Sequence, residues 1–479
     1  MMINNNQNQN IGNMKISQNM NNCDNQQMMI NNNQNIGNSN FNQTPNNISN
    51  QQINLNNYQN PSNWNGNQNK NNFSVNQMMM NNNNQKNGNW NNDQGVMKNQ
   101  ILINQKNYSQ QNETPQEINA QHRIGLVNVG QTCYMNASIQ SLSNIFELSK
   151  SLLKKFFDGK IDIDEQPLTA AFSSLLYELF HPKENEKYIA PTIFKEIIGE
   201  LNPLFKGMHA ADAKDLIFFI IEKLHKELNT INLDKQKTPQ MNYELQEKYS
   251  TNEQLMLQLF FNDFQAKNKT IISDLFYGIT RSIMKCEFCQ ITKYSFQTFN
   301  LLIFELKKVK EARIKDLGQY YTTLNIFDAF NVEKREEILE GENMIYCNNC
   351  NCLRKGKHQQ NIYSLPKILI IVLNRGKNNV DFNDEFAFPL DLDLTGQDIV
   401  INQQSFHKFY LCGVITHLGE SSASGHFIAY CRDGPSSEFF CYNDASVNPV
   451  KDEDVIKVKI SRKDNEKKTP YILFYHHLN

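Results

Sequence analysis

The residues with the clearest potential for chemistry begin with Cys133. It follows two glycines, Gly125 and Gly130, and stands where apolar residues begin to recur with a 3.6-residue period, which predicts a helix starting just after it. The positive end of a helix dipole favours a thiolate, and glycines allow tight turns that aim backbone N–H groups at one point. These features favour a reactive cysteine, although a lone cysteine at a helix start is more often a buried, inert thiol.

A base for this thiol is available far downstream. His426 follows Gly425 at the start of an alternating β-run, about 290 residues after Cys133. A nucleophile and its base can meet across two subdomains, and the imidazole then needs a third group to orient it. Asn443 closes the next β-run and offers that group, with Asp444 beside it. Each of these residues is a weak signal when taken alone.

Four other cysteines form two CxxC pairs. Cys286 and Cys289 make the first pair, and Cys347 and Cys350 make the second, about 57 residues later. Each CxxC turn can present two thiolates to one Zn²⁺ at about 2.3 Å, and two turns complete a tetrahedral shell. Such a shell leaves no open position, so the sequence predicts one structural zinc site, with free thiols as the alternative.

The elements that must position these residues change type along the chain. Helical periodicity dominates after residue 124, and β-type runs dominate beyond about residue 271. The predicted helices cover 134–146, 168–180, 191–201 and 211–227. The predicted strands cover 279–284, 293–299, 301–305, 361–363, 368–373, 410–417, 426–431, 438–443 and 471–475. Helices first and strands later indicate an α+β fold.

The segment 1–119 has a different composition. About 40 of the first hundred residues are Asn and about 15 are Gln. Such a segment cannot bury enough apolar surface to offset about 1–2 kcal/mol of backbone entropy per ordered residue. We therefore predict a disordered, low-complexity tail, followed by one large domain at 120–479. Asn/Gln-rich segments also self-associate, so a tail-driven assembly protein is an alternative.

Charge and hydropathy exclude several classes of protein. The formal net charge is -2, whereas non-specific binding to nucleic acid or membranes needs a positive field. No apolar run approaches the roughly 18 residues of a membrane span, and no signal peptide is visible at the start. We therefore expect no nucleic-acid or membrane partner, reduced cysteines and a cytoplasmic or nuclear location.

Together, these motifs resemble those of the ubiquitin-specific proteases, the papain-like cysteine peptidases that remove ubiquitin. Residues 125–137 are similar to the cysteine box of that family, and residues 410–447 are similar to its histidine box. The resemblance spans about residues 124–475. It implies a fingers–palm–thumb architecture with a zinc ribbon in the fingers. The helical thumb would cover about 124–270, and the palm and fingers about 271–479.

The resemblance also implies roles for individual residues. Cys133 would be the nucleophile, His426 the general base and acid, and Asn443 the residue that orients the histidine, supported by Asp444. Asn128, five residues before the cysteine, matches the side-chain donor that stabilises the oxyanion. The implied reaction is hydrolysis of the isopeptide or thioester-like bond at the C-terminal Gly of ubiquitin.

Some positions depart from the family pattern. Ala210 and Ala211 replace both glutamines of its Gln-Gln-Asp-Ala-x-Glu motif, although Asp212 and Asp215 keep their carboxylates. The resemblance implies that these two acids contact the arginine-containing tail of ubiquitin; a solvated helix face is the alternative. Gln131 stands where the family usually has Asn. These departures leave open a catalytically weak, ubiquitin-binding scaffold of the same fold.

Overall fold

The computed structural model describes most of the chain beyond residue 92. The described residues are 93–111, 121–229, 243–318, 323–376, 384–421, 424–432, 434, 437–456 and 468–478. The predicted disorder and self-association of the tail concern mainly residues outside these ranges. Within the described part, a largely helical region is followed by mostly antiparallel sheets that carry a few helices of their own, so the α+β class predicted from the sequence is confirmed.

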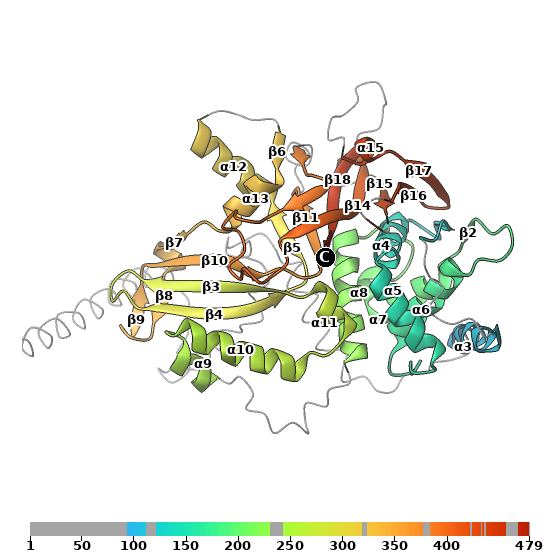
Figure 1. Ribbon diagram of the computed structural model, residues 1–479, viewed down its shortest axis with the longest axis horizontal. Helices are drawn as coiled ribbons and strands as arrows, with labels where there is room; N and C mark the ends of the chain where they lie inside the picture. Colours follow the sequence, from blue (N-terminus) through green and yellow to red (C-terminus); the bar gives the residue numbers. More distant parts are fainter. Residues whose placement is uncertain are drawn as a thin grey trace, which may run out of the picture.

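The first region is helical and forms the predicted thumb (Figure 1). Its elements are β1 (Gly125–Leu126), α4 (Cys133–Ser143), α5 (Phe146–Phe157), α6 (Pro167–Phe180), β2 (Tyr188–Ile189), α7 (Thr192–Leu201), η6 (Pro203–Phe205), α8 (Ala213–Leu228) and α11 (Ile271–Phe276). Every residue of α4 is buried, so this helix is the centre of the region. The helix predicted over 134–146 divides at Asn144, whose backbone N–H closes the end of α4.

The second region is a long sheet, the predicted palm. Its strand order is β17-β16-β15-β14-β18-β11-β5, and β13 pairs with β14. The strands are β5 (Leu302–Glu305), β11 (Ile368–Asn374), β13 (Asp391–Asp393), β14 (Lys408–Ser421), β15 (Ser424–Cys431), β16 (Phe439–Asn443), β17 (Ser446–Val450) and β18 (Lys468–His477). Successive side chains of a strand point to opposite faces. Accordingly, Ile370 of β11 joins the core shared with the thumb helices, and its neighbour Ile371 joins a second core behind the sheet.

The second core is covered by shorter elements on the far side of the palm. These are α12 (Leu306–Leu317), β6 (Thr323–Asn325), α13 (Ile326–Glu333), β12 (Glu385–Ala387) and α15 (Asp452–Ile456). Phe304, Phe330 and Phe386 are almost fully buried there. The palm therefore has an apolar layer on each face, which explains why β11 is apolar from Ile368 to Leu373.

The third region, the predicted fingers, extends away from the palm (Figure 1). It is a four-stranded sheet of order β4-β3-β10-β7 with a separate hairpin of β8 and β9. The elements are β3 (Gly278–Cys286), β4 (Thr292–Phe299), β7 (Glu337–Leu339), η8 (Gly341–Asn343), β8 (Ile345–Cys347), β9 (Cys352–Arg354) and β10 (Gly356–Ser364). The long antiparallel strands β3 and β10 extend from the palm, so the turns at their outer ends lie far from the main core.

Two helices lie in a different place from the one predicted. Helices α9 (Tyr243–Tyr249) and α10 (Glu253–Lys267) fall inside the segment assigned to the thumb, yet they lie along the fingers (Figure 1). Met256 and Phe260 of α10 pack with Phe296 of β4 in a core of their own. Helical periodicity shows that an apolar face exists but not which surface covers it, so the sequence did not predict that α9 and α10 pack on the fingers.

A further helix lies inside the segment predicted to be a tail. Helix α3 (Asp93–Gln111) packs against the thumb, with Ile101 fully buried. The Asn104 amide donates hydrogen bonds to the Ser174 hydroxyl at 2.9 Å and to the Glu178 carboxylate at 2.8 Å. The described fold therefore begins before the predicted boundary at residue 119. Composition hid this helix because its buried contacts are partly polar. Among the described residues, no helix has the length and apolarity needed to cross a bilayer.

Candidate active site

Cys133 is the first residue of α4, and its side chain is mostly buried. The loop before it is folded around Asn128, whose side-chain oxygen accepts hydrogen bonds from the backbone N–H groups of Gly130 at 3.2 Å and Thr132 at 3.0 Å. The Thr132 hydroxyl accepts a bond from the Val129 N–H at 3.0 Å and makes no cap bond to the helix. The N–H groups of the first helical turn have no intrahelical partner, and Cys133 stands at this end of α4.

His426 and Asn443 come from neighbouring antiparallel strands, β15 and β16. Ala429 of β15 is paired with Tyr442 of β16, so the start of one strand lies beside the end of the other. The His426 Nε2 atom is 2.7 Å from the Asn443 side-chain oxygen. The structure therefore brings together the two late residues that the sequence singled out.

The electrostatics place Cys133 next to the same imidazole. A hydrogen bond with the Cys133 sulfur is the largest effect on His426 and, against the opposing effect of burial, helps to raise its pKa to about 9. The Asn443 side chain and the negative charges of Cys133 and Asp444 act in the same direction. Because Nε2 is bound to Asn443, the other ring nitrogen is the one available to the sulfur.

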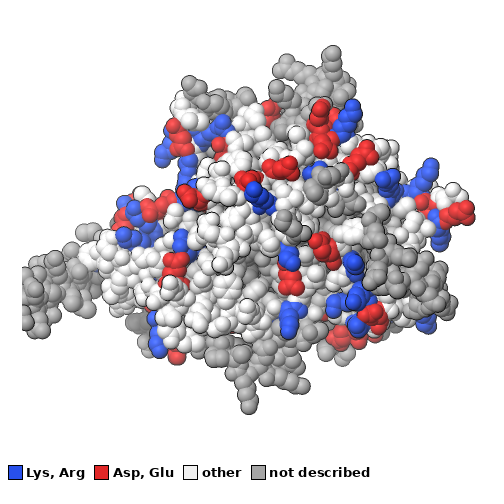
Figure 2. All heavy atoms as spheres, in the orientation of Figure 1, with Lys and Arg blue, Asp and Glu red and all other residues white. Residues whose placement is uncertain are grey.

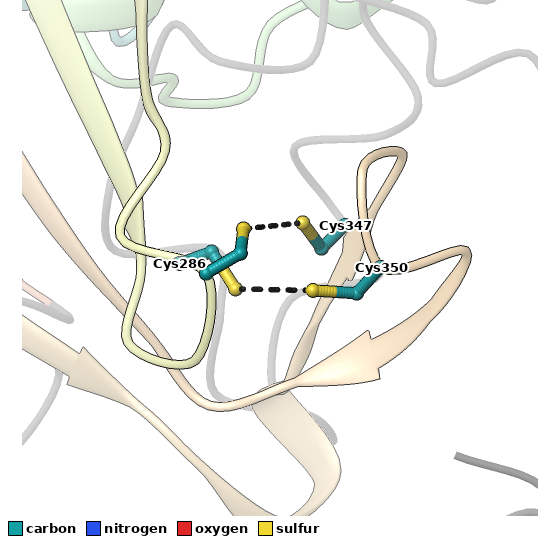
Figure 3. Close-up of side chains that lie close together, drawn as sticks. Cys286, Cys347 and Cys350 are labelled. Atoms are coloured by element: carbon teal, nitrogen blue, oxygen red, sulfur yellow. Dashed lines mark hydrogen bonds between the residues drawn. The ribbon is translucent and has the colours of Figure 1, made fainter. Parts of the chain in front are cut away.

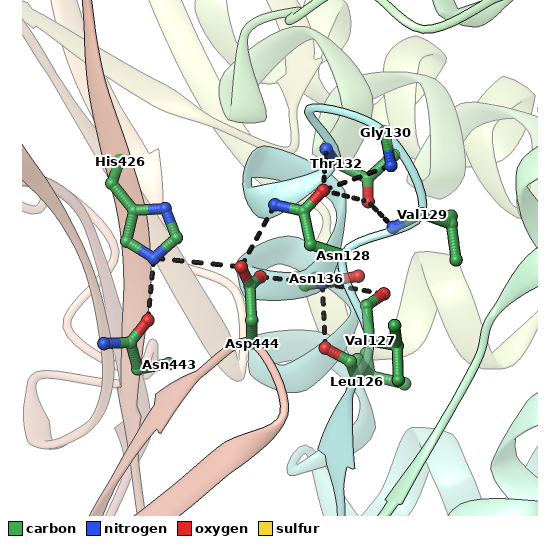
Figure 4. A network of polar contacts seen from close by, with 10 residues as sticks. All are labelled: Leu126, Val127, Asn128, Val129, Gly130, Thr132, Asn136, His426, Asn443 and Asp444. Atoms are coloured by element: carbon green, nitrogen blue, oxygen red, sulfur yellow. Dashed lines mark hydrogen bonds and ion pairs between the residues drawn. The ribbon is translucent and has the colours of Figure 1, made fainter.

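Asp444 connects the two halves of this arrangement (Figure 4). Its carboxylate accepts hydrogen bonds from the Asn128 amide at 3.0 Å and from the Asn136 amide at 2.8 Å. Its backbone oxygen accepts a bond from the Leu126 N–H at 2.8 Å. The same carboxylate is 4.0 Å from His426 Nε2. The turn after β16 is thus locked to the cysteine loop, and Asp444 lies closer to Asn128 than to the imidazole.

Asn136 is the residue in this network that the sequence did not identify. It lies one turn after Cys133 on α4, is almost fully buried, and also donates a hydrogen bond to the Leu126 carbonyl at 3.1 Å. A buried polar side chain needs partners, but α4 also buries Ser138, Gln140 and Ser141, so the sequence did not single out Asn136.

Asp212 and Asp215 lie about one turn apart at the start of α8. The Asp212 carboxylate caps this helix, accepting the Lys214 N–H at 2.8 Å, and also accepts the Tyr471 hydroxyl of β18 at 2.7 Å. Burial raises the pKa of Asp215, although Lys214 opposes the shift, with its Nζ 3.4 Å from the carboxylate. Both acids are half-buried, and Asp212 already has partners within the chain.

The four CxxC cysteines converge at the far end of the fingers (Figure 3). Their sulfur atoms all lie within 4.8 Å of one another, with 4.0 Å between Cys286 and Cys350 and 3.6 Å between Cys289 and Cys347. Four sulfurs bound tetrahedrally to one Zn²⁺ at about 2.3 Å are about 3.8 Å apart. The cluster therefore has the spacing of a metal-binding Cys₄ site, as the sequence predicted.

Comparisons with known proteins agree with this geometry. The family model described as ubiquitin carboxyl-terminal hydrolase matches residues 124–475. Ubiquitin carboxyl-terminal hydrolase 4 of Vanderwaltozyma polyspora is 27% identical over 398 residues, which cover 76% of this chain and 42% of that protein. Ubiquitin carboxyl-terminal hydrolase 2 of Bos taurus is 26% identical over 375 residues, which cover 75% of this chain and 57% of that protein.

A solved structure has the same fold. It is the SAGA DUB module of Ubp8, Sgf11, Sus1 and Sgf73 bound to monoubiquitin, with a TM-score of 0.53 and 18% identity, covering 74% of this chain and 69% of that one. The chain spans about two-fifths to three-fifths of the length of the curated relatives it matches. Because the family model covers far more than half of its residues, the chain belongs to the ubiquitin carboxyl-terminal hydrolase family, and the predicted ubiquitin-specific protease fold is confirmed.

Proposed function

We propose that this chain is a cysteine-type deubiquitinase that hydrolyses the bond at the C-terminal Gly of ubiquitin. The observation that carries the proposal is the convergence of Cys133 with His426 and Asn443, which lie on three different elements, Cys133 about 300 residues before the other two. A thiol, an imidazole and an orienting amide in this order form the constellation of papain-like proteases. Membership of the family supplies the substrate class.

In the proposed reaction, the thiolate sulfur of Cys133 attacks the carbonyl carbon of the terminal Gly and forms a C–S bond. The carbonyl oxygen becomes an oxyanion. Protonated His426 then donates its proton to the lysine nitrogen as the C–N bond breaks, which leaves a thioester. The neutral imidazole next accepts a proton from water, the resulting hydroxide attacks the thioester, and the Cys133 thiolate departs.

Asn128 is the proposed side-chain donor for the oxyanion. An amide NH₂ group has two hydrogens, and Asp444 accepts one of them. The other is available to a developing negative charge next to Cys133, together with the first backbone N–H groups of α4. The role we propose for Asp444 follows from the same bond, because it fixes the orientation of the Asn128 amide. A donor held in advance needs no reorganisation during the reaction.

We propose ubiquitin and ubiquitinated proteins as the partners. Asp212 and Asp215 place two carboxylates at the start of α8, close to the nucleophile loop, where they suit a positively charged segment of the substrate. On the face seen in Figure 2, basic and acidic side chains are interspersed. Such a surface supports recognition of a folded protein rather than of nucleic acid.

For the Cys₄ cluster we propose one Zn²⁺ with a purely structural role. Cys286, Cys289, Cys347 and Cys350 would hold it. When bound, the metal neutralises four thiolates and ties the β3–β4 turn to the β8–β9 turn. The site is in the fingers, away from Cys133, so it takes no part in the chemistry.

The proposed location is the cytoplasm, the nucleus or both. Eight of the nine cysteines of the described part form no disulfide, which suits a reducing compartment. One experiment tests the proposed function: the full chain is mixed with ubiquitin carrying a C-terminal fluorophore in amide linkage. We expect release of the fluorophore, abolished in Cys133→Ala. Tight binding of ubiquitin without turnover would favour the scaffold. The absence of both binding and turnover would overturn the proposal.

A further inference from the structure

We propose that Gln131 is a positioning residue for the nucleophile. Its side chain joins the loop that carries Cys133 to the loop formed by residues 207–211, and thereby holds the start of α4 in its reactive orientation. The inference rests on the proposed function, because the orientation matters only if Cys133 attacks a substrate.

The backbone at this point has a conformation that needs support. Gly130 has φ 119° and Gln131 has φ 53°, so two consecutive residues lie on the positive side. A residue with a Cβ atom in the left-handed region is less stable by roughly 1–2 kcal/mol, and Asn is accepted there more readily than Gln. Asn128 holds the N–H groups on either side of Gln131, at Gly130 and Thr132. These two bonds do not involve Gln131, so its left-handed backbone needs a contact from another part of the chain.

Loop 207–211 supplies that support from outside. The Ala210 N–H donates a hydrogen bond to the Gln131 side-chain oxygen at 3.1 Å. Next to it, the Met208 side chain lies over Gly130, where an added Cβ would be 3.1 Å from the Met208 methyl carbon. Met208 is nonetheless 73% exposed. Two adjacent contacts thus connect the two loops, and only the one from Gln131 is a directed bond.

The outer loop is itself anchored to the palm. Gly207, with φ 81°, allows the turn that begins it, and Asp212 follows its last residue. The Asp212 carboxylate caps α8 and accepts the hydroxyl of Tyr471 from β18. Gln131 therefore provides a second connection between the cysteine loop and the sheet that bears His426, separate from the one through Asp444 and Asn128.

The consequence for the reaction is specific. If the tether is lost, the first turn of α4 can rotate relative to His426, and small displacements of reacting groups lower the rate steeply. Asp212 keeps its own bonds to α8 and Tyr471, so we expect binding of ubiquitin to change little. We expect kcat to fall about tenfold while KM changes by less than about twofold. The rate is normalised to the folded fraction measured by urea unfolding, because partial unfolding also lowers the apparent kcat.

Three substitutions in the full chain separate the tether from a mere spacer. Gln131→Met keeps the length and removes the acceptor. Gln131→Asn keeps the amide and suits the left-handed backbone better, but it is too short to reach Ala210. Gln131→Glu keeps an acceptor at the same place. We expect the tenfold loss of kcat in the Met and Asn variants and recovery to within about threefold of the wild type in the Glu variant.

Two further measurements do not depend on ubiquitin. Hydrogen exchange of the Ala210 amide should accelerate at least about fivefold in the Met and Asn variants but not in the Glu variant. Alkylation of Cys133 by iodoacetamide should likewise slow in the Met and Asn variants but not in the Glu variant. If Gln131→Asn showed the wild-type rates of Cys133 alkylation and of Ala210 amide exchange, the proposed role of Gln131 would be wrong. A wild-type protein that is alkylated in this way but never hydrolyses ubiquitin would overturn the proposed function and leave the tether standing.

Discussion

Two regions of this molecule use cysteine for opposite purposes, and their surroundings differ accordingly. At the junction of thumb and palm, the sulfur of Cys133 faces the imidazole of His426. At the end of the fingers, four sulfurs face one another within 4.8 Å. A single thiol beside a cation is arranged for attack, whereas four convergent thiols suit a metal and leave none for a substrate. The neighbours, not the residue type, decide the chemistry.

The two regions also depend on the fold to different extents. The Cys₄ cluster needs only two local turns, each of which brings its own pair of thiols. The thumb–palm site needs α4, β15 and β16 to meet, with the Asp444 turn locked to the strand at Leu126. A disturbance of the interface between thumb and palm should therefore damage the Cys133 site and spare the Cys₄ cluster.

The largest expected effect is the loss of hydrolysis when the single thiol is removed. In Cys133→Ala, kcat should fall by at least about 10⁴-fold, as occurs when a nucleophile is deleted from a catalytic triad. Thermal stability and zinc content should not change. The matched control is Cys441→Ala, a half-buried thiol of β16 that should keep activity within about twofold. Equal losses in both variants would contradict the distinction between the thiols.

A smaller but still large effect is expected from the orienting amide. Asn443→Ala removes the acceptor for His426 Nε2, and we expect kcat/KM to fall by about 10²-fold. His426 must be protonated to donate to the leaving amine, so activity should decline as pH rises through its pKa of about 9. Because the Asn443 side chain helps to raise that pKa, the variant should lose activity at a lower pH. Asn448→Ala, which alters only an exposed amide of β17, should show the wild-type pH profile.

The third prediction concerns the other set of thiols. Cys286→Ser should reduce bound zinc from one equivalent and lower the Tm by about 5–10 °C, because a structural metal contributes directly to folding. The rate of Cys133 alkylation by iodoacetamide should stay the same, since the two regions share no residues. Metal analysis and differential scanning calorimetry test the first part. A purified wild-type protein with no zinc would remove the metal from the account.

The smallest effect is expected at a surface contact between thumb and palm. His476 of β18 lies 2.9 Å from Glu147 of α5, and this bond, against burial, raises the pKa of His476. Protonated His476 stabilises the fold fully below its unfolded pKa of about 6.5 and loses that effect as pH rises through the folded value. Glu147→Gln should therefore destabilise by about 0.2–1 kcal/mol at pH 6 and by less at pH 9.

The control for this contact is Glu196→Gln, which changes an exposed carboxylate on α7. Urea unfolding of both variants at the two pH values gives the comparison. If Glu147→Gln destabilised the protein more at pH 9 than at pH 6, the proposed sign of the linkage would be wrong. Zinc binding at the fingers should be insensitive to either variant.

The sequence predicted the parts of the fold that depend on local pattern. The apolar period after Cys133 located α4, and the CxxC spacing predicted the cluster that the structure contains. The signature motifs also identified His426 and Asn443 as site candidates, because the order of these motifs along the chain is a property of the family.

What the sequence could not predict depends on contacts between distant segments. The amide of Asn104 that holds α3 on the thumb has no local signal, and the apolar face of α10 does not reveal that it packs on the fingers. The bond from Ala210 to Gln131 involves a backbone N–H, which every residue but proline possesses. Such contacts become visible only when the chain is folded.

The central claim is that Cys133 attacks the C-terminus of ubiquitin. The most direct measurement uses full-length protein and ubiquitin whose terminal Gly carries an electrophile, followed by peptide mass spectrometry of the adduct. We predict one covalent adduct, attached to Cys133 and absent from Cys133→Ala. An adduct on a different cysteine, or the same yield of adduct in the variant, would contradict the account.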